Sequence, residues 1–311
     1  MGNLKYEKNQ FRLFSEAAEK YKQEKRQIVS DYEGMGKGIG NLLPYIGHLQ
    51  IIDVDNDALG GFKEDRLAGC GSFKRGAAAG TVNKELAFVT AILNRACRLW
   101  RWLRSAPLIL PVEGPKAAPY VLDRAQQDAL LRRLPGYLSR AYLFDVNTGI
   151  RQQELHDLDW RNEVRHDDLM GFILRKTKNG QQRFCVCNSI AKSIVEGQRG
   201  KHPTRVFTNR EGSGGIRKSV ARYHWITAWG EAGLPSDPFV LKGVHNLRHT
   251  YGHRLRACGV SEEDVGTLLG HHNANITSHY SQPDIERLTM LSERVVERRE
   301  TVILRAVSAT G

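Results

Sequence analysis

The feature that most restricts how this chain can fold is the stretch 243–281, which reads GVHNLRHTYGHRLRACGVSEEDVGTLLGHHNANITSHYS. His245 and Arg248 are three residues apart within it, so both side chains point to the same side of a helix. Leu247, which stands between them, is left for the buried side of that helix. The pattern therefore predicts a helix that presents an imidazole and a guanidinium together.

The same stretch predicts a second, shorter helix at residues 261–269. Ser261 is a suitable N-cap, acidic residues occupy the first turn, and Gly270 is a natural helix stop. His271 therefore lies just beyond a helix end, in a loop of the kind that often carries chemistry. Tyr280 follows nine residues after that histidine.

In this order and at this spacing, the pieces H-x-x-R, L-G-H and Tyr resemble the C-terminal signature of the tyrosine recombinase (phage integrase) family. The resemblance implies a mainly α (α+β) fold. An N-terminal helical core-binding domain and an α-rich catalytic domain with a small antiparallel β-sheet would form a C-shaped DNA clamp. The resemblance also implies an earlier arginine and a lysine in a β-hairpin.

The earlier arginine is Arg151. Residues 148–155 read TGIRQQEL and are similar to the family's first box, T-G-x-R-x-x-E-L. An arginine in the first turn after a glycine can direct its planar guanidinium into a cleft. Glu154, one turn later, can hold that guanidinium by a salt bridge.

The lysine is expected in a hairpin between two β-like runs, because the sequence Asn-Gly at residues 179–180 is a strong signal for a tight turn. Residues 177–183 read TKNGQQR and resemble the family phrase T-K-x-x-x-x-R, which makes Lys178 the counterpart of the family's lysine. Lys176, two residues earlier on the same strand face, is an open alternative.

The resemblance implies a role for each of these residues in cutting DNA without a metal or a cofactor. Tyr280 would be the nucleophile that forms a 3′-phosphotyrosyl link. The two arginines would hold the non-bridging phosphate oxygens, and the lysine would protonate the leaving 5′-oxygen. His245 would assist proton transfer, and His271 would donate a hydrogen bond to the phosphate. The expected catalytic residues are Arg151, Lys178, His245, Arg248, His271 and Tyr280, supported by Glu154 and His249.

Charge and cysteine content agree with a nucleic-acid partner inside the cell. The chain has 311 residues, a formal net charge of +12 and a pI of about 9.6, which favours a polyanionic partner. No apolar run approaches the ~20 residues of a membrane span, and the N-terminus lacks the apolar core of a signal peptide. Five scattered cysteines fit a reducing compartment, and Cys185 and Cys187 are expected to be buried. We expect a cytoplasmic, nucleoid-associated protein.

Two domains joined by a linker are expected. Residues 1–105 predict a helical DNA-binding domain, in which four glycines between Gly34 and Gly40 break the chain before a short helix. Prolines recur through residues 106–122, which predicts an extended linker. Residues 123–311 would be the catalytic domain with a C-terminal helix and tail.

Basic side chains on helices and in a Gly- and Ala-rich loop are candidates for contacts with the phosphate backbone. In the N-terminal half, a helix at residues 81–102 carries several of them around an apolar stripe. A solvated helix face would show the same pattern. The candidates are Lys74, Arg75, Lys84, Arg95, Arg98, Arg101, Arg217 and Lys218.

Three other interpretations compete with recombination. His245, His249 and His253 recur at intervals of four and share a helix face, as zinc ligands can. However, the glutamate of H-E-x-x-H is missing and Arg248 would repel a cation, so no metal site is expected. A type IB topoisomerase shares the chemistry, and a DNA-binding protein of this fold needs no catalysis. The T-G-x-R-x-x-E-L and L-G-H pieces favour the recombinase.

The expected partners follow from the resemblance. They are double-stranded DNA attachment sites and other copies of the chain, as a dimer or tetramer on DNA. Accessory DNA-bending or directionality factors would act in the same complex. A C-terminal helix after Pro283 would dock on a neighbouring subunit, with packing on its own domain as the open alternative.

Overall fold

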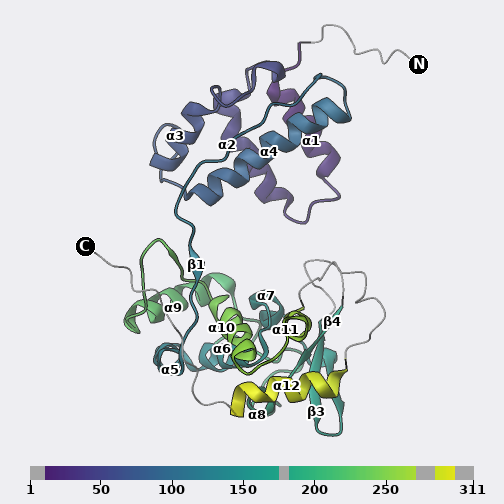
Figure 1. The fold of residues 1–311 in the computed structure, drawn as a ribbon, viewed down its shortest axis with the longest axis vertical. Helices are drawn as coiled ribbons and strands as arrows, with labels where there is room; N and C mark the ends of the chain where they lie inside the picture. Colours follow the sequence, from purple (N-terminus) through teal and green to yellow (C-terminus); the bar gives the residue numbers. More distant parts are fainter. Residues whose placement is uncertain (1–10, 175–181, 271–283, 298–311) are drawn as a thin grey trace. The chain divides into compact units, whose positions relative to one another are not determined.

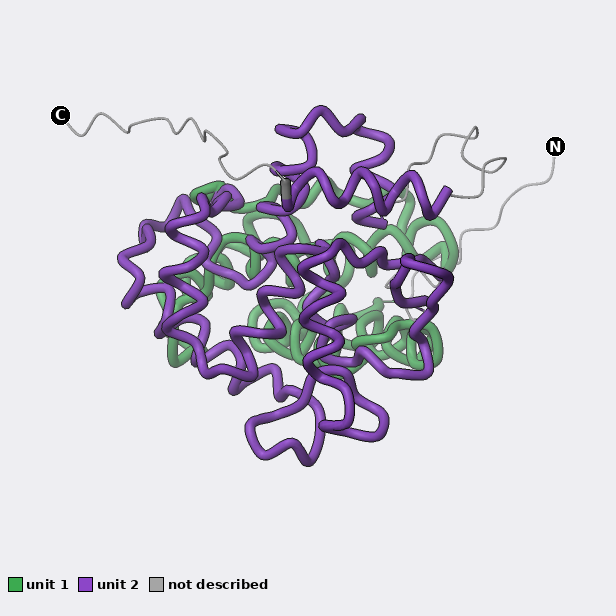
Figure 2. The backbone as a smooth tube through the Cα atoms, turned by 90° about the horizontal axis from the view of Figure 1, so that it is seen from below, with its two compact units in different colours: residues 1–116 green, residues 117–311 purple. Residues whose placement is uncertain are grey.

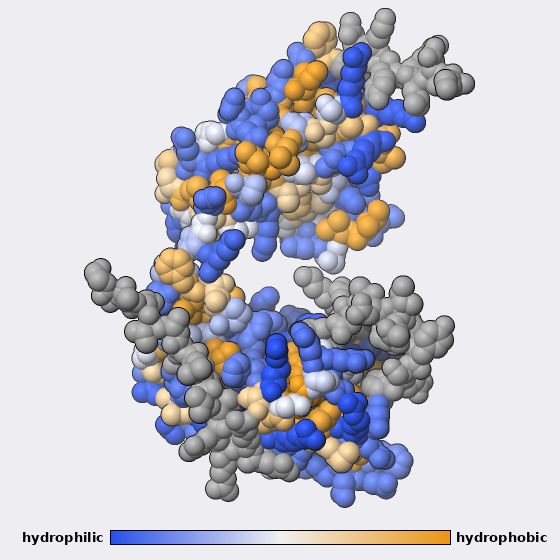
Figure 3. All heavy atoms as spheres, viewed as in Figure 1, coloured by the Kyte–Doolittle hydropathy of each residue, from blue (hydrophilic) through white to orange (hydrophobic). Residues whose placement is uncertain are grey.

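The structure is a computed structural model that describes residues 11–174, 182–270 and 284–297. The chain divides into two units, residues 1–116 and 117–311 (Figures 1 and 2). Each unit has a hydrophobic core of its own. On the face seen in Figure 3, hydrophilic side chains of the described residues are interrupted by hydrophobic groups in both units.

Unit 1 is built from helices. They are α1 (Phe14–Lys25), α2 (Tyr32–Ile46), the 3-10 helix η1 (Ile51–Asp53), α3 (Gly60–Ala68) and α4 (Ala79–Arg98). The predicted apolar stripe of α4 is confirmed, because its members are all buried: Val82, Leu86, Val89, Leu93 and Ala96. This stripe packs with α1 and α2 in the core of the unit.

The prediction that the glycines break the chain is wrong, because α2 runs through all four of them. Asp31 starts this helix by accepting a hydrogen bond from the Gly34 amide at 2.9 Å. Gly38 lies against α4, where a Cβ would approach the Phe88 ring to 2.7 Å. Each glycine costs a helix about 1 kcal/mol, and the burial of apolar side chains on the inner face of α2 offsets this loss.

The helix predicted to extend to residue 102 ends earlier, at Arg98. Arg101 has a φ of 57°, in the left-handed region where a helix cannot continue. Trp100 and Trp102 on either side of it pack against each other, with ring centroids 4.9 Å apart. The Trp100 indole also donates to Glu24 at 2.7 Å, so tertiary contacts hold this turn in place of a further helical turn.

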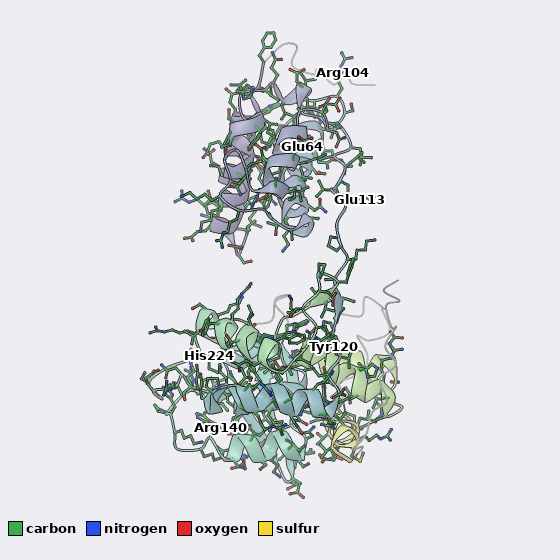
Figure 4. The ribbon with its side chains drawn as sticks, turned by 90° about the vertical axis from the view of Figure 1, so that its left-hand side faces the viewer. Glu64, Arg104, Glu113, Tyr120, Arg140 and His224 are labelled. Atoms are coloured by element: carbon green, nitrogen blue, oxygen red, sulfur yellow. The ribbon has the colours of Figure 1, made fainter. Side chains whose placement is uncertain are left out.

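Much of the segment predicted as a linker is bound to one unit or the other. Asn83 accepts from the Val112 amide at 2.8 Å and donates to the Val112 carbonyl at 3.0 Å, which attaches the proline-rich segment to α4. At the other end, Tyr120 (Figure 4) packs on Trp229 with ring centroids 5.7 Å apart, and Leu122 is fully buried in unit 2. A short connection near residues 115–117 is left between the units.

Unit 2 combines helices with a three-stranded antiparallel sheet. The strands are β2 (Glu163–His166), β3 (Leu169–Leu174) and β4 (Arg183–Val186), in the order β2-β3-β4. β1 (Ala118–Pro119) pairs in parallel with β5 (Val240–Leu241). The remaining elements are α5 (Arg124–Arg133), α6 (Gly136–Thr148), α7 (Gln152–His156), η2 (Trp160–Asn162), α8 (Ser189–Glu196), α9 (Lys218–Glu231), α10 (Asn246–Ala257), α11 (Glu262–Leu269) and α12 (Ile285–Glu297). The predicted mainly α (α+β) class is confirmed.

The edge strand β4 is covered on both faces. Cys185 and Cys187 face the larger core of the unit and are buried, as predicted, while Val186 faces a second cluster formed with α10, α11 and α12. In the register of the sheet, Leu174 lies opposite Arg183, so the paired strands β3 and β4 flank residues 175–181.

α12 packs on its own unit. Its buried Leu288, Leu291 and Val295 join the second cluster, and the Tyr251 hydroxyl of α10 lies 2.8 Å from the Ser292 hydroxyl. Of the two open alternatives for the C-terminal helix, residues 285–297 therefore adopt packing within the chain, because this contact buries their apolar stripe. In the described ranges, no helix is long and apolar enough to cross a membrane.

Candidate functional site

Arg151 is held at a tight turn between two helices. α6 ends at Gly149, whose φ of 61° suits glycine, and a Cβ there would lie 2.6 Å from both Leu269 and Tyr251. Arg151 then forms the N-cap of α7. Its backbone amide donates to Glu154 Oε2 and its Nη1 to Glu154 Oε1, both at 3.0 Å. The expected contact between the two side chains is present.

Arg248 projects from α10 into the interior of unit 2. Its side chain is buried and donates to the Gly149 carbonyl at 2.5 Å and to the Leu269 carbonyl. Burial, and then the charges of Arg183 and Arg151, lower its pKa to about 10. The guanidinium therefore keeps its positive charge at neutral pH, beside the turn that carries Arg151.

The C-terminal end of α11 brings three guanidinium groups together. Helix ends leave carbonyls without partners inside the helix. Here Arg183 donates to the Leu268 carbonyl at 3.4 Å, Arg248 to the Leu269 carbonyl, and Arg151 to the Gly270 carbonyl at 2.9 Å. Three consecutive carbonyls are thus bound by arginines from three different parts of unit 2. The predicted Ser261 cap and Gly270 stop of α11 are both confirmed.

Glu154 lies between two of these arginines. Its Oε2 accepts from Arg183 Nη2 at 2.5 Å, while its Oε1 accepts from Arg151. Burial alone would raise the pKa of Glu154, but the hydrogen bond and charge of Arg183, together with Arg151, lower it below its ordinary value. The ionised carboxylate leaves a net positive charge among the three arginines and suits the region for an anion.

A second carboxyl group lies deeper in unit 2. Asp145 on α6 is 1% exposed, and its Oδ1 has no hydrogen-bond partner among the described residues. Burial raises its pKa well above the ordinary value, and the charges of Arg248 and Arg183 oppose this only in part. The Asp145 carboxyl is therefore protonated under conditions in which Glu154 is ionised.

His245 and His249 lie next to each other at the start of α10. Their ring centroids are 4.8 Å apart, with the rings nearly perpendicular. Burial and the charge of Arg248 lower the pKa of His249, so this ring is neutral at pH 7. In the parts of the chain that the structure describes, no group of three His, Cys, Asp or Glu residues is placed to hold a metal ion.

Most of the basic residues expected to contact DNA are exposed. In unit 1 these are Lys74, Arg75, Lys84, Arg98 and Arg101, and in unit 2 they are Arg217 and Lys218 at the start of α9. Arg95 differs from them, because it pairs with Glu24 at 3.1 Å and lies over the Tyr21 ring. These contacts give Arg95 a role in packing α4 on α1.

Several predicted residues fall outside the described ranges. They are Lys178 and its alternative Lys176, His271 and Tyr280. Among the described residues, the structure brings Arg151, Glu154 and Arg248 together. Residues 175–181 begin directly after β3, and residue 271 follows the bound carbonyl of Gly270.

Sequence reasoning missed two residues of this region. Arg183 appears in the phrase TKNGQQR, but its contacts with Glu154 and Leu268 depend on segments far away along the chain. Asp145 had a visible signal, because it is an acidic residue among the apolar residues of α6, next to Phe144 and Val146.

The chain is similar to known proteins in both sequence and fold. Residues 122–287 match the model of the phage integrase family. The chain is 25% identical over 219 residues to the integrase of Salmonella phage P22. This alignment covers 68% of this chain and 56% of the phage protein. It is also 25% identical over 226 residues to the tyrosine recombinase XerA of Thermococcus onnurineus, covering 69% of this chain and 76% of that protein. The match thus spans little more than half of the phage protein.

Solved structures have a similar fold at low sequence identity. The Tn1549 transposon integrase in complex with circular intermediate DNA superimposes with a TM-score of 0.63 at 17% identity, covering 88% of this chain and 98% of that chain. A lambda integrase dimer bound to a core site gives a TM-score of 0.64 at 11% identity, covering 86% and 98%. Because the family model covers more than half of the sequence, the chain belongs to the phage integrase family.

Proposed function

We propose that this protein is a site-specific DNA recombinase that cuts and rejoins strands through a 3′-phosphotyrosyl intermediate. The observation that carries the proposal is the convergence of Arg151 and Arg248 on adjacent carbonyls at the end of α11. A guanidinium has five N–H donors, and these contacts occupy two on each arginine. The remaining donors make no other hydrogen bond to the described residues and would bind the non-bridging oxygens of a phosphate.

The chemistry requires a nucleophile, neutralisation of charge and a proton for the leaving group. In our proposal Tyr280 attacks the phosphorus, and its phenolate oxygen replaces the 5′-oxygen of the next nucleotide. Arg151 and Arg248 stabilise the extra negative charge of the pentacovalent phosphorus. Lys178, or Lys176 in its place, gives a proton to the departing 5′-oxygen, while His245 and His271 assist around the phosphate. The reverse attack by a 5′-hydroxyl of another strand completes the exchange without metal or ATP.

The proposed partners are double-stranded attachment sites and further copies of the chain. Lambda integrase has been solved as a dimer on a core site and as a tetramer on a Holliday junction, which supports assembly on DNA for this protein as well. Units 1 and 2 would then act as the DNA-binding and catalytic domains of a C-shaped clamp. Accessory bending or directionality factors, and action at the cytoplasmic nucleoid, belong to the same proposal.

Covalent trapping on DNA tests the proposal. Purified protein is mixed with nicked duplexes that carry candidate attachment sequences, in the presence of EDTA, and is separated on a denaturing gel. We expect a DNA-linked band for the wild-type protein and none for Tyr280→Phe. Joining to a second duplex would separate recombination from topoisomerase-type relaxation. Tight binding with no covalent band on any duplex would instead favour a non-catalytic DNA-binding protein.

A further inference from the structure

We propose that Arg183 is a positioning residue that keeps Arg151 available for the phosphate, an inference that rests on the proposed function. Arg183 begins β4, opposite Leu174, at the point where the paired strands flank residues 175–181. Its side chain is only 9% exposed, which is low for an arginine at the end of a strand. Such burial requires partners, and these partners connect three parts of the site.

The first partner is the carboxylate of Glu154. Arg183 Nη2 lies 2.5 Å from Glu154 Oε2, and Arg183 Nε lies 3.5 Å from Oε1. The same carboxylate accepts from Arg151 Nη1 and from the Arg151 backbone amide, each at 3.0 Å. Glu154 is therefore shared between two guanidinium groups, and its negative charge is divided between them.

This sharing decides how strongly Arg151 can attract an anion. If Arg183 were absent, the buried Glu154 carboxylate would pair with Arg151 alone, and that pair would have no net charge. With Arg183 present, the two guanidinium groups of Arg151 and Arg183 and the Glu154 carboxylate together carry a charge of +1. A phosphate that binds beside Arg151 then meets a positive field in a region of low dielectric, where charges interact strongly.

The second partner is the end of α11. Arg183 Nη1 donates to the Leu268 carbonyl at 3.4 Å, two residues before the Gly270 carbonyl that Arg151 holds. Gly270 has a φ of 64°, and a Cβ on it would overlap the Cδ of Arg183. The side chain of Arg183 thus passes directly over Gly270, and any larger residue there would displace it. Arg183 links β4, α7 and the segment that ends at Gly270.

The decisive experiment compares Arg183→Met with the double variant Glu154→Gln plus Arg183→Met. We expect Arg183→Met to slow covalent trapping by roughly 100-fold, the usual scale for losing an oxyanion contact, with DNA affinity within about threefold of wild type. The double variant lacks the Glu154 carboxylate that would otherwise pair with Arg151 alone, so it should trap DNA about 10-fold faster than Arg183→Met. If Arg183→Met slowed trapping only by disturbing the structure, the double variant would trap DNA at the same rate as Arg183→Met or more slowly.

A substrate with a neutral linkage provides a second readout. When the scissile phosphate carries a methyl group in place of one anionic oxygen, the positive field has less charge to stabilise. The defect of Arg183→Met should therefore shrink on this methylphosphonate duplex. Arg165→Met is the matched control, because Arg165 also forms ion pairs on the same sheet, at β2, but away from Glu154. It should trap DNA at the wild-type rate.

Gly270→Ala displaces the Arg183 side chain from its position over residue 270 without removing a charge. Gly200 is its matched control, because its φ of 76° imposes similar strain while its Cβ position is open. Gly270→Ala should reduce trapping by ~10-fold or more, and Gly200→Ala should not. Equal trapping by Gly270→Ala and wild type, or by Arg183→Met and wild type, would overturn the role of Arg183 while leaving the proposed function intact.

A binding measurement separates the two proposals if trapping fails in every protein. Inorganic phosphate is titrated at constant ionic strength while the melting temperature is followed. We expect a saturable rise for the wild-type protein and for the double variant, and little rise for Arg183→Met. That pattern without covalent product would refute the proposed function and support Arg183 as the residue that tunes Arg151. A full rise in Arg183→Met would refute the inference itself.

Discussion

At the scale of single residues, buried charged groups in unit 2 divide into two kinds. Arg248 and Arg254 lie on the same helix, α10, and are 3% and 2% exposed. Arg248 faces the carbonyls around Gly149 and Leu269, whereas Arg254 donates to Gln127 at 2.6 Å and to the Leu122 carbonyl at 3.2 Å. The first belongs to the candidate site and the second holds the entry of the chain into unit 2.

Replacing Arg248 and Arg254 by lysine, one at a time, should show which of them contributes to the rate of covalent trapping and which contributes only to stability. A lysine cannot reproduce the paired donors of a guanidinium, so Arg248→Lys and Arg254→Lys should each lower the free energy of unfolding by about 1–3 kcal/mol. Only Arg248→Lys should also slow covalent trapping, by ~100-fold or more. Urea unfolding and the trapping assay would measure the two effects. Equal loss of trapping in both variants would mean that Arg248 has only a structural role.

Asp145 predicts a pH dependence of stability with a definite sign. Because its pKa is raised in the folded state, the folded protein keeps this proton at pH values where the unfolded chain has released it. The stability that results is present below a pH of about 4, the ordinary pKa of an aspartate, and is lost as the pH rises toward the folded-state pKa. Asp145→Asn, which has no proton to lose, should therefore stabilise the protein at pH 7.

Thermal unfolding at several pH values would check this expectation. The stabilisation by Asp145→Asn should disappear as the pH falls to about 3, below the ordinary pKa of an aspartate, where the wild-type carboxyl is largely neutral in both states. Asp168→Asn is a suitable control, because that side chain is fully exposed on the β2–β3 turn. A loss of stability in Asp145→Asn at pH 7 that fades as the pH falls would mean that the carboxylate is ionised and paired with Arg248.

At the scale of elements, α4 holds both the core of unit 1 and the proline-rich segment that leaves it. Asn83 bonds to both the amide and the carbonyl of Val112, much as a neighbouring strand would. Asn56 binds the same segment a few residues earlier, by donating to the Leu108 carbonyl at 2.7 Å and accepting from the Leu110 amide at 2.8 Å. Two amide side chains thus fix an extended segment that has no regular secondary structure.

Asn83→Ala should release this segment. We expect about 1–2 kcal/mol of lost stability for the missing hydrogen bonds and roughly 10-fold faster hydrogen exchange at the Val112 amide. Asn94→Ala, further along α4, is the control for loss of an asparagine from the same helix. Unchanged exchange at Val112 in Asn83→Ala would indicate that apolar contacts, such as that of the buried Ile109, hold the segment on their own.

At the scale of the whole molecule, each unit buries its own apolar residues. A fragment that begins at residue 115 retains the β1–β5 pair, Tyr120 and Leu122, whereas one that begins at the predicted boundary, residue 123, lacks all three. Leu122 is fully buried, and its loss should lower stability by about 2–3 kcal/mol. We expect both fragments to unfold cooperatively, with a lower melting temperature for the shorter one. Equal melting temperatures would support a boundary at residue 123.

Local signals predicted the parts of the fold that depend on near neighbours along the chain. The Ser261 cap, the Gly270 stop and the apolar stripe of α4 each follow from a few adjacent residues, and the structure confirms them. The glycines of α2 are also a local signal, but the chain break that they predict is wrong, because α2 runs through them. The failure has a physical cause, because burial of the apolar residues on the inner face of α2 outweighs the low helix propensity of its glycines.

By itself, the sequence determined the order and spacing of the H-x-x-R, L-G-H and T-G-x-R-x-x-E-L pieces, and with them the family. Each of those patterns consists of residues that are close together along the chain, so it can be recognised without the folded structure. Only the tertiary structure decided that Arg151, Arg183 and Arg248 bind consecutive carbonyls at the C-terminal end of α11 and its cap, that Glu154 is shared, and that Asp145 is buried near them. These residues come from segments up to about 120 positions apart, and their charges depend on burial and on neighbours that packing alone brings together.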